Sequence, residues 1–463
     1  MDLEGKTVLV IGLGRTGIAT ARFLLDKGAR VLAADEKPIS ELGEAIAPLR
    51  GVPGIEFGIG QGDLDALSRV DLIVPSPGVA PFHPLLAEGA RRNMLIVSEL
   101  ELASGYVKKP IVAITGTNGK TTTTTLLGEI LERCGKRAFV GGNIGTPLIS
   151  HVGGSQEEDF VVLEVSSFQL QWVSDFHPFI AMLLNVSCDH LDYHASLEEY
   201  RAVKERIFAR QGRRDLAILN GDDPQLADLA ERLPAEHVVL FSSFSKPAEG
   251  IFVDGEFLRY RFAGRDETYP VGAIRLKGAH NLENIMAAVV AARMCGCSPE
   301  GIAEVVNTFT GIAHRIEFAG TADGVAYYDD SKGTNVDAVY RALQSFDGPV
   351  VLLLGGRYKG GDFTVLETLL RERVKALIVF GEAADRIEAM IGGTVETERA
   401  GTLREAVGLA RRIATPGDTV LLSPGCSSFD EFKNYEERGS VFKDLVRKMG
   451  RERNTGTWAK NLQ

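Results

Sequence analysis

The sequence predicts an α/β protein of three domains built on mostly parallel sheets. Its 463 residues exceed one ordinary domain of about 150 residues. Short apolar runs alternate with amphipathic stretches along the chain, an order that favours parallel strands joined by helices. Glycine-rich turns follow two of these runs, at Gly12 and Gly116. We therefore expect a Rossmann-like N-terminal domain, a central P-loop-type ATPase domain and a Rossmann-like C-terminal domain.

The composition is that of a soluble enzyme, with 44% apolar and 24% charged residues. The sequence has no run of about 18 apolar residues and no apolar N-terminal signal segment, so we expect a cytoplasmic protein without membrane insertion. The five cysteines are odd in number and scattered, which favours free thiols. The net charge of -11 argues against a general nucleic-acid binder. An anionic nucleotide would need local amides, lysines and a metal ion.

The N-terminal domain, residues 1–108, is expected to hold strands at 7–11, up to Asp35, and at 71–74. Gly12-x-Gly14-x-x-Gly17 follows the first strand, and Asp35 ends the second. Amides at a helix N-terminus suit a pyrophosphate, and the carboxylate suits a ribose hydroxyl. Taken alone, the motif favours an NAD(P) dehydrogenase. The same geometry suits any nucleotide diphosphate or a tight packing turn, so the ligand stays open here.

The central domain, residues 109–312, lies between breaks at "YVKKP" and "TGIAHR". Its predicted elements are strands from Ile111 and at 160–167, 179–187 and 216–223, a hairpin turning at Asp254-Gly255, and a helix at 281–294.

The loop after Ile111 carries half of a phosphate-binding motif, Gly119-Lys120-Thr121, with Ile114 where the first glycine belongs. Lys120 can reach β- and γ-phosphates, and the following helix presents its positive end. Thr121 or Thr122 can hold magnesium. Five consecutive threonines are poor helix formers, so local preference is overridden here, as expected at a functional helix start.

Further candidates for metal and phosphate contacts follow in this domain. Glu164 ends an apolar strand, where a carboxylate suits magnesium. "NVSCDHLDYH" places Asp189, His190, Asp192 and His194 within one short segment. Lys204 lies in a charged helical face and by its pattern alone reads as a surface lysine.

The C-terminal domain, residues 313–463, is expected to hold strands in "VAYYDDS" (325–331) and at 349–356, 376–381 and 419–425, with a frayed polar tail after Arg447. Lysines and hydroxyls follow its strands, which indicates a site for a small anionic molecule; these candidates are Arg315, Asp330, Lys332, Thr334, Asn335, Lys359, Ser427 and Ser428.

Taken together, these segments resemble the Mur ligase family, most closely its D-glutamate-adding branch. The resemblance rests on "GTNGKTT", "GGNIGTPL", "EVSSFQL", "NVSCDHLDYH", "YRAVKERIF", "GAHNLENIMAA", "AHRIEF", "DDSKGTNVDA", "LLLGGRYKGGDF" and "LSPGCSSFDEFKNYEERG". It covers the chain up to about residue 447. This family uses a shortened G-[ST]-N-G-K-[ST] loop for ATP, which accounts for Ile114. The N-terminal glycine turn would then bind a UDP-sugar.

The resemblance implies a role for each candidate. The ATP-binding set would be Gly116, Thr117, Asn118, Gly119, Lys120, Thr121, Thr122, Asn281, Arg315, Asp330 and Lys332. The UDP-substrate set would be Gly14, Arg15, Thr16, Asp35, Glu36, Lys37, Ser76, Asn143, Ser166 and Gln169. D-glutamate would be bound by Thr334, Lys359, Ser428 and Tyr435. Two magnesium ions would be held by Thr121, Glu164, His190 and Lys204, the last as a carbamylated lysine. The catalytic residues would be Lys120, His190 and Lys204.

The implied reaction joins D-glutamate to UDP-N-acetylmuramoyl-L-alanine through an acyl phosphate, with ATP as co-substrate, in peptidoglycan precursor synthesis. The protein would be a cytoplasmic monomer that binds no nucleic acid. Alternatives stay open: a sister Mur ligase or folylpolyglutamate-type ligase with another amino acid, an NAD-dependent oxidoreductase with a regulatory NTPase domain, or a nucleotide-gated binding protein without catalysis. Arg357-Tyr358 stand where an acidic residue is usual, and Tyr435 where an aromatic without a hydroxyl is common.

Overall fold

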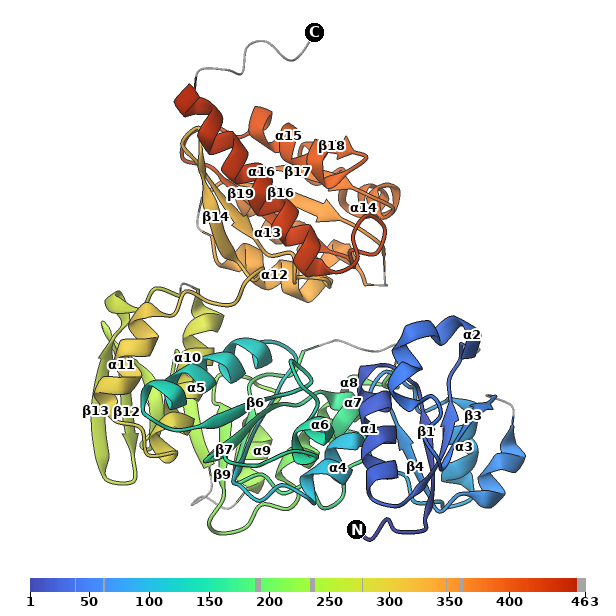
Figure 1. Cartoon of the computed structure of the whole chain (residues 1–463). Coiled ribbons are helices and arrows are strands. Elements are labelled where there is room, and N and C mark those ends of the chain that lie inside the picture. Colours follow the sequence, from blue (N-terminus) through green and yellow to red (C-terminus); the bar gives the residue numbers. More distant parts are fainter. Residues whose placement is uncertain are drawn as a thin grey trace. The chain divides into compact units, whose positions relative to one another are not determined.

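The computed structural model describes residues 1–37, 39–60, 63–187, 193–233, 238–276, 278–346, 348–358 and 361–455. They form three β-sheets flanked by helices (Figure 1). By internal contacts the chain divides into two compact units: a first unit of residues 1–274 and 283–308, and a second unit of residues 275–282 and 309–463. None of the helices in the described part is long and apolar enough to span a membrane.

The first sheet has four parallel strands in the order β3-β2-β1-β4. The strands are β1 (Thr7–Ile11), β2 (Arg30–Ala34), β3 (Ile55–Ile59) and β4 (Leu72–Pro75). The helical segments around them are α1 (Arg15–Asp26), α2 (Ile39–Leu42), η1 (Gly43–Leu49), η2 (Leu64–Arg69) and α3 (Pro84–Arg91). Apolar β-branched and aliphatic residues fill β1 and β2, so both strands are buried on both faces, as in other parallel sheets.

The second sheet has nine strands in the order β13-β12-β11-β10-β9-β8-β5-β7-β6. The strands from β6 to β11 in this order are parallel, and β11, β12 and β13 form an antiparallel meander. The strands are β5 (Ile111–Thr115), β6 (Ala138–Gly142), β7 (Phe160–Glu164), β8 (Ile180–Leu183), β9 (Leu216–Asn220), β10 (Val238–Ser242), β11 (Gly250–Asp254), β12 (Phe257–Phe262) and β13 (Arg265–Pro270). The helical segments are α4 (Glu99–Ser104), α5 (Lys120–Arg133), α6 (Leu148–Val152), α7 (Ser167–Leu170), α8 (Leu197–Glu205), η3 (Arg206–Phe208), α9 (Ala227–Arg232), η5 (Val271–Ala273), α10 (Ala279–Met294) and α11 (Pro299–Thr308).

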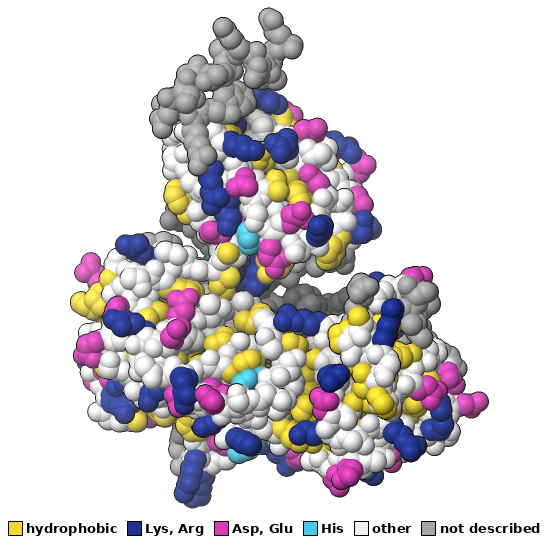
Figure 2. Space-filling view, in the orientation of Figure 1, with side chains coloured by type: hydrophobic (Ala, Val, Ile, Leu, Met, Phe, Trp, Pro, Cys, Tyr) yellow, Lys and Arg dark blue, Asp and Glu magenta, His cyan; other side chains and the backbone are white. Residues whose placement is uncertain are grey.

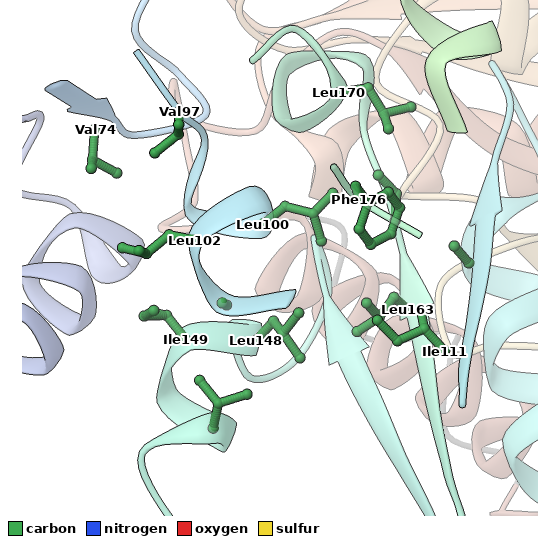
Figure 3. Close-up of a cluster of buried hydrophobic side chains, with 14 of the residues drawn as sticks. Val74, Val97, Leu100, Leu102, Ile111, Leu148, Ile149, Leu163, Leu170 and Phe176 are labelled. Carbon is green, nitrogen blue, oxygen red and sulfur yellow. The ribbon is translucent and has the colours of Figure 1, made fainter. Parts of the chain in front are cut away.

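The two sheets of the first unit share one hydrophobic core around the short helix α4. Figure 3 shows Leu100 and Leu102 of α4 beside Leu148 and Ile149 of α6, in the same cluster as Val74 of the first sheet. Glu101, also on α4, accepts hydrogen bonds from the Ser174 hydroxyl and from three backbone amides at residues 174–176, at 2.8–3.2 Å. Apolar burial joins the N-terminal sheet to the central sheet, and the Glu101 carboxylate fixes α4 to the segment that follows α7.

The second unit carries a six-stranded sheet in the order β14-β15-β19-β16-β17-β18, parallel except for the β14–β15 pair. Its strands are β14 (Glu317–Ala322), β15 (Val325–Asp329), β16 (Val350–Gly355), β17 (Val374–Phe380), β18 (Thr397–Ala400) and β19 (Thr419–Gly425). Its helical segments are α12 (Val336–Gln344), η6 (Phe363–Leu366), α13 (Glu367–Arg373), α14 (Ala384–Ile391), α15 (Leu403–Ile413) and α16 (Tyr435–Thr455). The expected fraying after Arg447 is wrong as far as Thr455, because α16 continues to that residue, and residues 456–463 lie outside the described part.

The structure confirms the α/β class and the mostly parallel sheets, but the sequence missed several strands. Of these, β3, β6, β13, β14 and β18 each lie at a sheet edge. Each is partly exposed, so its sequence lacks the continuous apolar run of a buried strand. The remaining one, β10, is an interior strand.

The distribution of charged side chains and the state of the cysteines are both as the composition suggests. Acidic and basic side chains are interspersed on the face shown in Figure 2. Among the described residues, Cys134, Cys295, Cys297 and Cys426 form no disulfide, as predicted, and Cys188 lies outside the described residues.

Replacing the buried Glu101 carboxylate by its amide, Glu101→Gln, should lower the stability of the first unit. The amide nitrogen cannot accept hydrogen bonds, so some of the four donors lose their partner, at a cost of about 2–4 kcal/mol. Urea unfolding monitored by circular dichroism would measure the change. Glu129→Gln, at an exposed position on α5, serves as the control and should unfold like the wild type. An unchanged midpoint for Glu101→Gln would contradict the assigned role.

Candidate functional site

The glycine turn after β1 is held in its shape by steric contacts that leave no room for side chains. Gly12 has a φ of +87°, and a Cβ on Gly17 would lie 1.8 Å from the Gly12 carbonyl oxygen. The Ser76 hydroxyl donates a hydrogen bond of 2.7 Å to the same oxygen. The turn therefore brings the N-terminus of α1, at Gly14, close to the end of β4.

The Asp35 carboxylate is hydrogen-bonded to the backbone on both sides of this turn. Its carboxylate accepts hydrogen bonds from the backbone amides of Leu13 at 2.6 Å and Lys37 at 2.9 Å. The negative charge thus orders the loops after β1 and β2 on either side of the α1 N-terminus.

A cavity of about 710 Å³ opens at this turn. Nine of the ten residues predicted to bind the UDP-substrate line it: Gly14, Arg15, Thr16, Asp35, Glu36, Lys37, Ser76, Asn143 and Gln169. The tenth, Ser166, caps α7 through a reciprocal pair of hydrogen bonds with Gln169. Both sheets of the first unit therefore contribute to one cavity.

The first sheet argues against a dinucleotide. A dinucleotide-binding fold joins two mononucleotide-binding halves, with strands in the order 3-2-1-4-5-6. In the described residues this sheet has only the four strands β3-β2-β1-β4, which is one half with a single extra strand. A nucleoside diphosphate fits this architecture better than NAD, so the dehydrogenase alternative loses its main support.

The second glycine loop connects β5 to α5 and is held by internal hydrogen bonds. The Lys120 ammonium donates to the carbonyl oxygens of Gly116 and Thr117, each at 2.8 Å. The side chain of Asn185 accepts from the Asn118 amide at 2.8 Å and donates to its carbonyl at 3.2 Å. Thr121 and Thr122 follow in the first turn of α5. The loop is thereby pre-shaped at the positive end of a helix, as a phosphate site requires.

Gly119, the N-cap of α5, is in the left-handed region at φ +86°. A Cβ there would lie 2.1 Å from Oδ1 of the buried Asn284. Sequence reasoning singled out neither Asn284 nor Asn185 as a site residue. Asn185 directly follows the apolar run that ends β8, a position at which a polar side chain signals a site.

Glu164 ends β7 in register with Ile114 of β5, so it lies beside the start of the phosphate loop. One carboxylate oxygen, Oε1, accepts a 2.8 Å hydrogen bond from the Asn143 side chain. The other, Oε2, is buried and has no hydrogen-bond partner among the described residues. A buried carboxylate oxygen without a donor is costly unless a cation offsets it, so this position fits a hard divalent ion.

Lys204 is buried, with 1% of its surface exposed, which corrects the surface position that its helical pattern alone suggested. Its ammonium donates to the Gly116 carbonyl at 2.9 Å and lies 4.4 Å from the centre of the Tyr200 ring. This side chain therefore reaches the phosphate loop from α8. His190, Asp189 and Asp192 lie outside the described residues; His194 is described and is buried.

The remaining nucleotide candidates, Asn281, Arg315, Asp330 and Lys332, belong to the second unit. Arg315 lies between two residues in the left-handed region, His314 at φ +65° and Ile316 at φ +48°. A β-branched residue rarely adopts such a φ, so the backbone around Arg315 is strained. His314 Nδ1 lies 2.7 Å from Asp329 Oδ2, a contact that anchors this segment to β15.

The loop after β15 is held by buried polar contacts. Asp330 accepts a 2.6 Å hydrogen bond from the Ser423 hydroxyl, and burial raises its pKa to about 7. Arg438 of α16 is fully buried and donates to Ser331 and to the carbonyls of Cys426 and Ser427. Arg438, which sequence reasoning missed, thus ties the loop after β15 to the loop after β19.

The predicted amino-acid residues lie partly around these loops. Thr334 follows the β15 loop, buried Ser428 follows Ser427, and the ring centre of Tyr435 lies 5.7 Å from the Lys332 ammonium. Lys359 lies outside the described residues. Arg357 pairs with Glu382 through two hydrogen bonds of 2.9 and 3.0 Å, so its charge is offset at the surface.

Three family models match the chain in succession. They are described as "Mur ligase MurD-like, N-terminal domain" over residues 6–98, "Mur ligase middle domain" over residues 114–292 and "Mur ligase, glutamate ligase domain" over residues 314–426.

Curated relatives match over nearly the full length. The UDP-N-acetylmuramoylalanine--D-glutamate ligase of Syntrophus aciditrophicus (strain SB) is 53% identical, with 96% of this chain and 99% of the relative covered. That of Geotalea uraniireducens (strain Rf4) is 47% identical, with 97% and 99% covered.

Solved structures share the fold at low sequence identity. MurF ligase from Thermotoga maritima in complex with ADP aligns with a TM-score of 0.61 at 17% identity, with 97% of this chain and 96% of that chain covered. A pseudomurein peptide ligase type C from Methanothermus fervidus aligns with a TM-score of 0.59 at 20% identity, with 96% and 100% covered. With the three family models and the relatives in full-length agreement, the chain belongs to the Mur ligase family.

Proposed function

We propose that the chain is an ATP-dependent, ADP-forming ligase that adds D-glutamate to UDP-N-acetylmuramoyl-L-alanine in peptidoglycan precursor synthesis. One observation carries this proposal. Asn143 lines the cavity at the glycine turn and also donates to Glu164, the carboxylate beside the phosphate loop. A substrate in the cavity and an ATP on the loop would meet at this residue pair. Relatives that carry the name of this ligase, at 45–53% identity, support the choice of substrates.

Each of the three proposed domains is assigned one substrate. Residues 1–108 would bind the UDP-sugar, residues 109–312 would bind ATP, and residues 313–463 would bind D-glutamate. The three sheets support this division, and the start of the second unit's main segment at Phe309 lies close to the proposed last boundary.

The reaction needs a leaving group on the substrate, because a carboxylate is a poor acyl donor. Transfer of the γ-phosphoryl group of ATP to the alanyl carboxylate releases ADP and gives an acyl phosphate. The amine of D-glutamate then attacks the acyl carbon, and collapse of the tetrahedral adduct releases phosphate and leaves the amide. Lys120 and the amides at the α5 N-terminus would bind the transferred phosphate and offset its charge. Positioning of the two anions supplies much of the rate.

The donor set fits magnesium, and the family resemblance implies two such ions. Glu164 with its partnerless buried oxygen, together with Thr121, His190 and Lys204, would hold them. Bound magnesium supplies positive charge that reduces repulsion between the triphosphate and the substrate carboxylate.

Lys204 would act as a carbamate. Its ammonium lies within hydrogen-bond distance of the Gly116 carbonyl, and carbamylation would replace this cation with a carboxylate-like group of oxygen ligands. Lys204 is buried beside the phosphate loop, so the carbamate would lie next to the proposed ATP site.

In the second unit, Asn281, Arg315, Asp330 and Lys332 would contact the nucleotide. Thr334, Lys359, Ser428 and Tyr435 would bind D-glutamate, whose carboxylates suit a lysine and hydroxyl donors. The connection through Arg438 supports a shared role for the loops after β15 and β19.

The first test measures phosphate release from ATP and magnesium with UDP-N-acetylmuramoyl-L-alanine and one candidate amino acid at a time. Release only with D-glutamate is expected. Release only with L-alanine, a diamino acid or a dipeptide would move the enzyme to a sister activity. No release with any amino acid would contradict the ligase function.

Adding a methyl group to the phosphate loop, Gly119→Ala, should raise the KM for ATP more than tenfold, because the new Cβ meets Asn284 and the left-handed φ is strained. Gly135→Ala, just beyond the C-terminal end of α5, is the matched control: its φ is +73°, but nothing lies within 4 Å of a new Cβ. That variant should lose about 1 kcal/mol of stability and keep the wild-type KM. Equal KM values for both variants would rule out the steric explanation.

Asp330→Asn should reduce the pH dependence of stability in the second unit. The pKa of Asp330 is about 7 in the folded state, above its ordinary unfolded value of about 3.9. Between these values the unfolded chain releases a proton that the folded chain keeps, so stability falls as pH rises from 4 to 7 and stays low above. Asp330→Asn removes the titrating carboxyl group, so the variant should not show this fall in folding stability of about 2–4 kcal/mol. Thermal unfolding at pH 5 and pH 8 would measure it, and parallel pH profiles for both proteins would refute the assignment.

A further inference from the structure

Two neighbouring residues, Phe82 and His83, line the 710 Å³ cavity without having a role in the proposed chemistry. They lie in the segment that connects β4 to α3, and His83 is the N-cap of α3. The sequence motifs did not single out either of them.

The His83 ring is buried, with 7% of the residue exposed, and it has no hydrogen-bond partner among the described residues. Its side chain does not cap α3, and Nδ1 is closed off from solvent. The other nitrogen, Nε2, is not closed off in this way, so it is the ring atom that a ligand in the cavity can reach. A buried polar ring without a partner is costly, which points to a ligand that supplies one.

The protonation of His83 makes Nε2 a donor. Burial lowers the pKa of His83 and outweighs the opposing effect of Glu36, so the ring is neutral at pH 7. A neutral imidazole carries one N–H. Buried N–H groups without an acceptor are rarer in proteins than acceptors without a donor, so we place the proton on Nε2 and leave a lone pair on the enclosed Nδ1.

Backbone contacts fix the position of this ring. The His83 amide donates to the Ala80 carbonyl at 2.9 Å, and the His83 carbonyl accepts from the Ala87 amide at 2.9 Å. Pro84, whose φ is fixed by its ring, is the first residue of α3. A Cβ on Gly12 would lie 3.0 Å from the Val79 side chain, so the same loop packs against the glycine turn.

Phe82 is 71% exposed although it lines the cavity. The wall next to it is also apolar, and its members are Pro77, Val79, Ala80 and Pro84. Of the parts of a sugar nucleotide, only the base is both planar and aromatic. An exposed aromatic ring beside an apolar wall suits stacking with such a base.

We propose that Phe82 and His83 form the base-binding part of the sugar-nucleotide site: the Phe82 ring stacks on the uracil, and His83 Nε2 donates a hydrogen bond to one of the two uracil carbonyl oxygens. This inference rests on the proposed function, which supplies the uridine diphosphate.

The stacking is tested on the full chain by calorimetry, with UDP displacing UDP-N-acetylmuramoyl-L-alanine in the absence of ATP. Phe82→Ala should weaken UDP binding about five- to tenfold, and Phe82→Trp should keep the Kd within about twofold of the wild type. Phe244→Ala is the matched control, because Phe244 is 86% exposed in the same unit but does not line the cavity. Its Kd should change less than twofold.

The hydrogen bond is tested with 2-thio-UDP and 4-thio-UDP, since sulfur is a weak acceptor. One of the two should bind the wild type about three- to tenfold more weakly than UDP. In His83→Phe, UDP binding should weaken by a similar factor and the difference between UDP and that analogue should disappear. His83→Gln, which keeps a donor, should retain part of the difference. The KM for ATP should change less than twofold in each variant.

Three results would overturn this inference and leave the ligase function intact: equal binding of the three nucleotides to the wild type, the same preference in His83→Phe as in the wild type, or an unchanged Kd in Phe82→Ala. Substrate binding that UDP does not displace would do the same. A wild type that binds neither UDP nor UDP-N-acetylmuramoyl-L-alanine would contradict the proposed function as well. Thermal unfolding checks that each variant is folded, and His83→Leu replaces His83→Phe if the latter is not.

Discussion

The hydrogen bond between Asn143 and Glu164 is the contact on which the proposed site in the first unit depends. Strands β5, β7 and β6 lie side by side and parallel, so their carboxyl ends meet at one edge, with Glu164 in register with both Ile114 and Gly142. The Asn143 side chain bridges that edge at 2.8 Å, and its backbone amide donates to the Glu164 carbonyl at 2.9 Å. Because Asn143 also lines the cavity, a phosphate on the loop and an acyl group in the cavity would be brought to one place.

The two glycine loops of the first unit share one steric feature. In each, a backbone or side-chain oxygen occupies the space of a missing Cβ: the Gly12 carbonyl at Gly17 and the Asn284 side chain at Gly119. These close contacts fix the conformation of each loop in the absence of a ligand. Binding a ligand therefore costs the loop little further conformational entropy. The loops are thus alike in local construction, and it is the surrounding sheet that distinguishes them. The four-stranded sheet provides half of a dinucleotide site, and the nine-stranded sheet provides a neighbouring carboxylate.

In the second unit, buried polar groups fix the conformation of the loops near the proposed site. In the first unit, close contacts at glycine residues do so. Arg438 donates four hydrogen bonds within a space closed to solvent and holds two loops that follow neighbouring parallel strands, β15 and β19. Asp330 remains buried next to this network despite the cost to its ionised form. Such groups are expensive for stability and specify one loop geometry, as does the strained backbone around Arg315.

The sequence by itself determined most of the interior parallel strands and the two glycine loops, because apolar runs and loop motifs are local signals. With the family resemblance, it also predicted nine residues of the cavity wall. Edge strands such as β3 and β18 escaped it, since a half-exposed strand has no continuous apolar run. Only the tertiary structure decided that Lys204 is buried against the phosphate loop and that the Asn284 side chain occupies the space of a Cβ at Gly119. It also decided that buried Glu99 accepts a hydrogen bond from α6 and that buried Arg438 donates to the loop after β15. Burial and hydrogen-bond partners depend on contacts between residues distant in sequence, which no local pattern encodes.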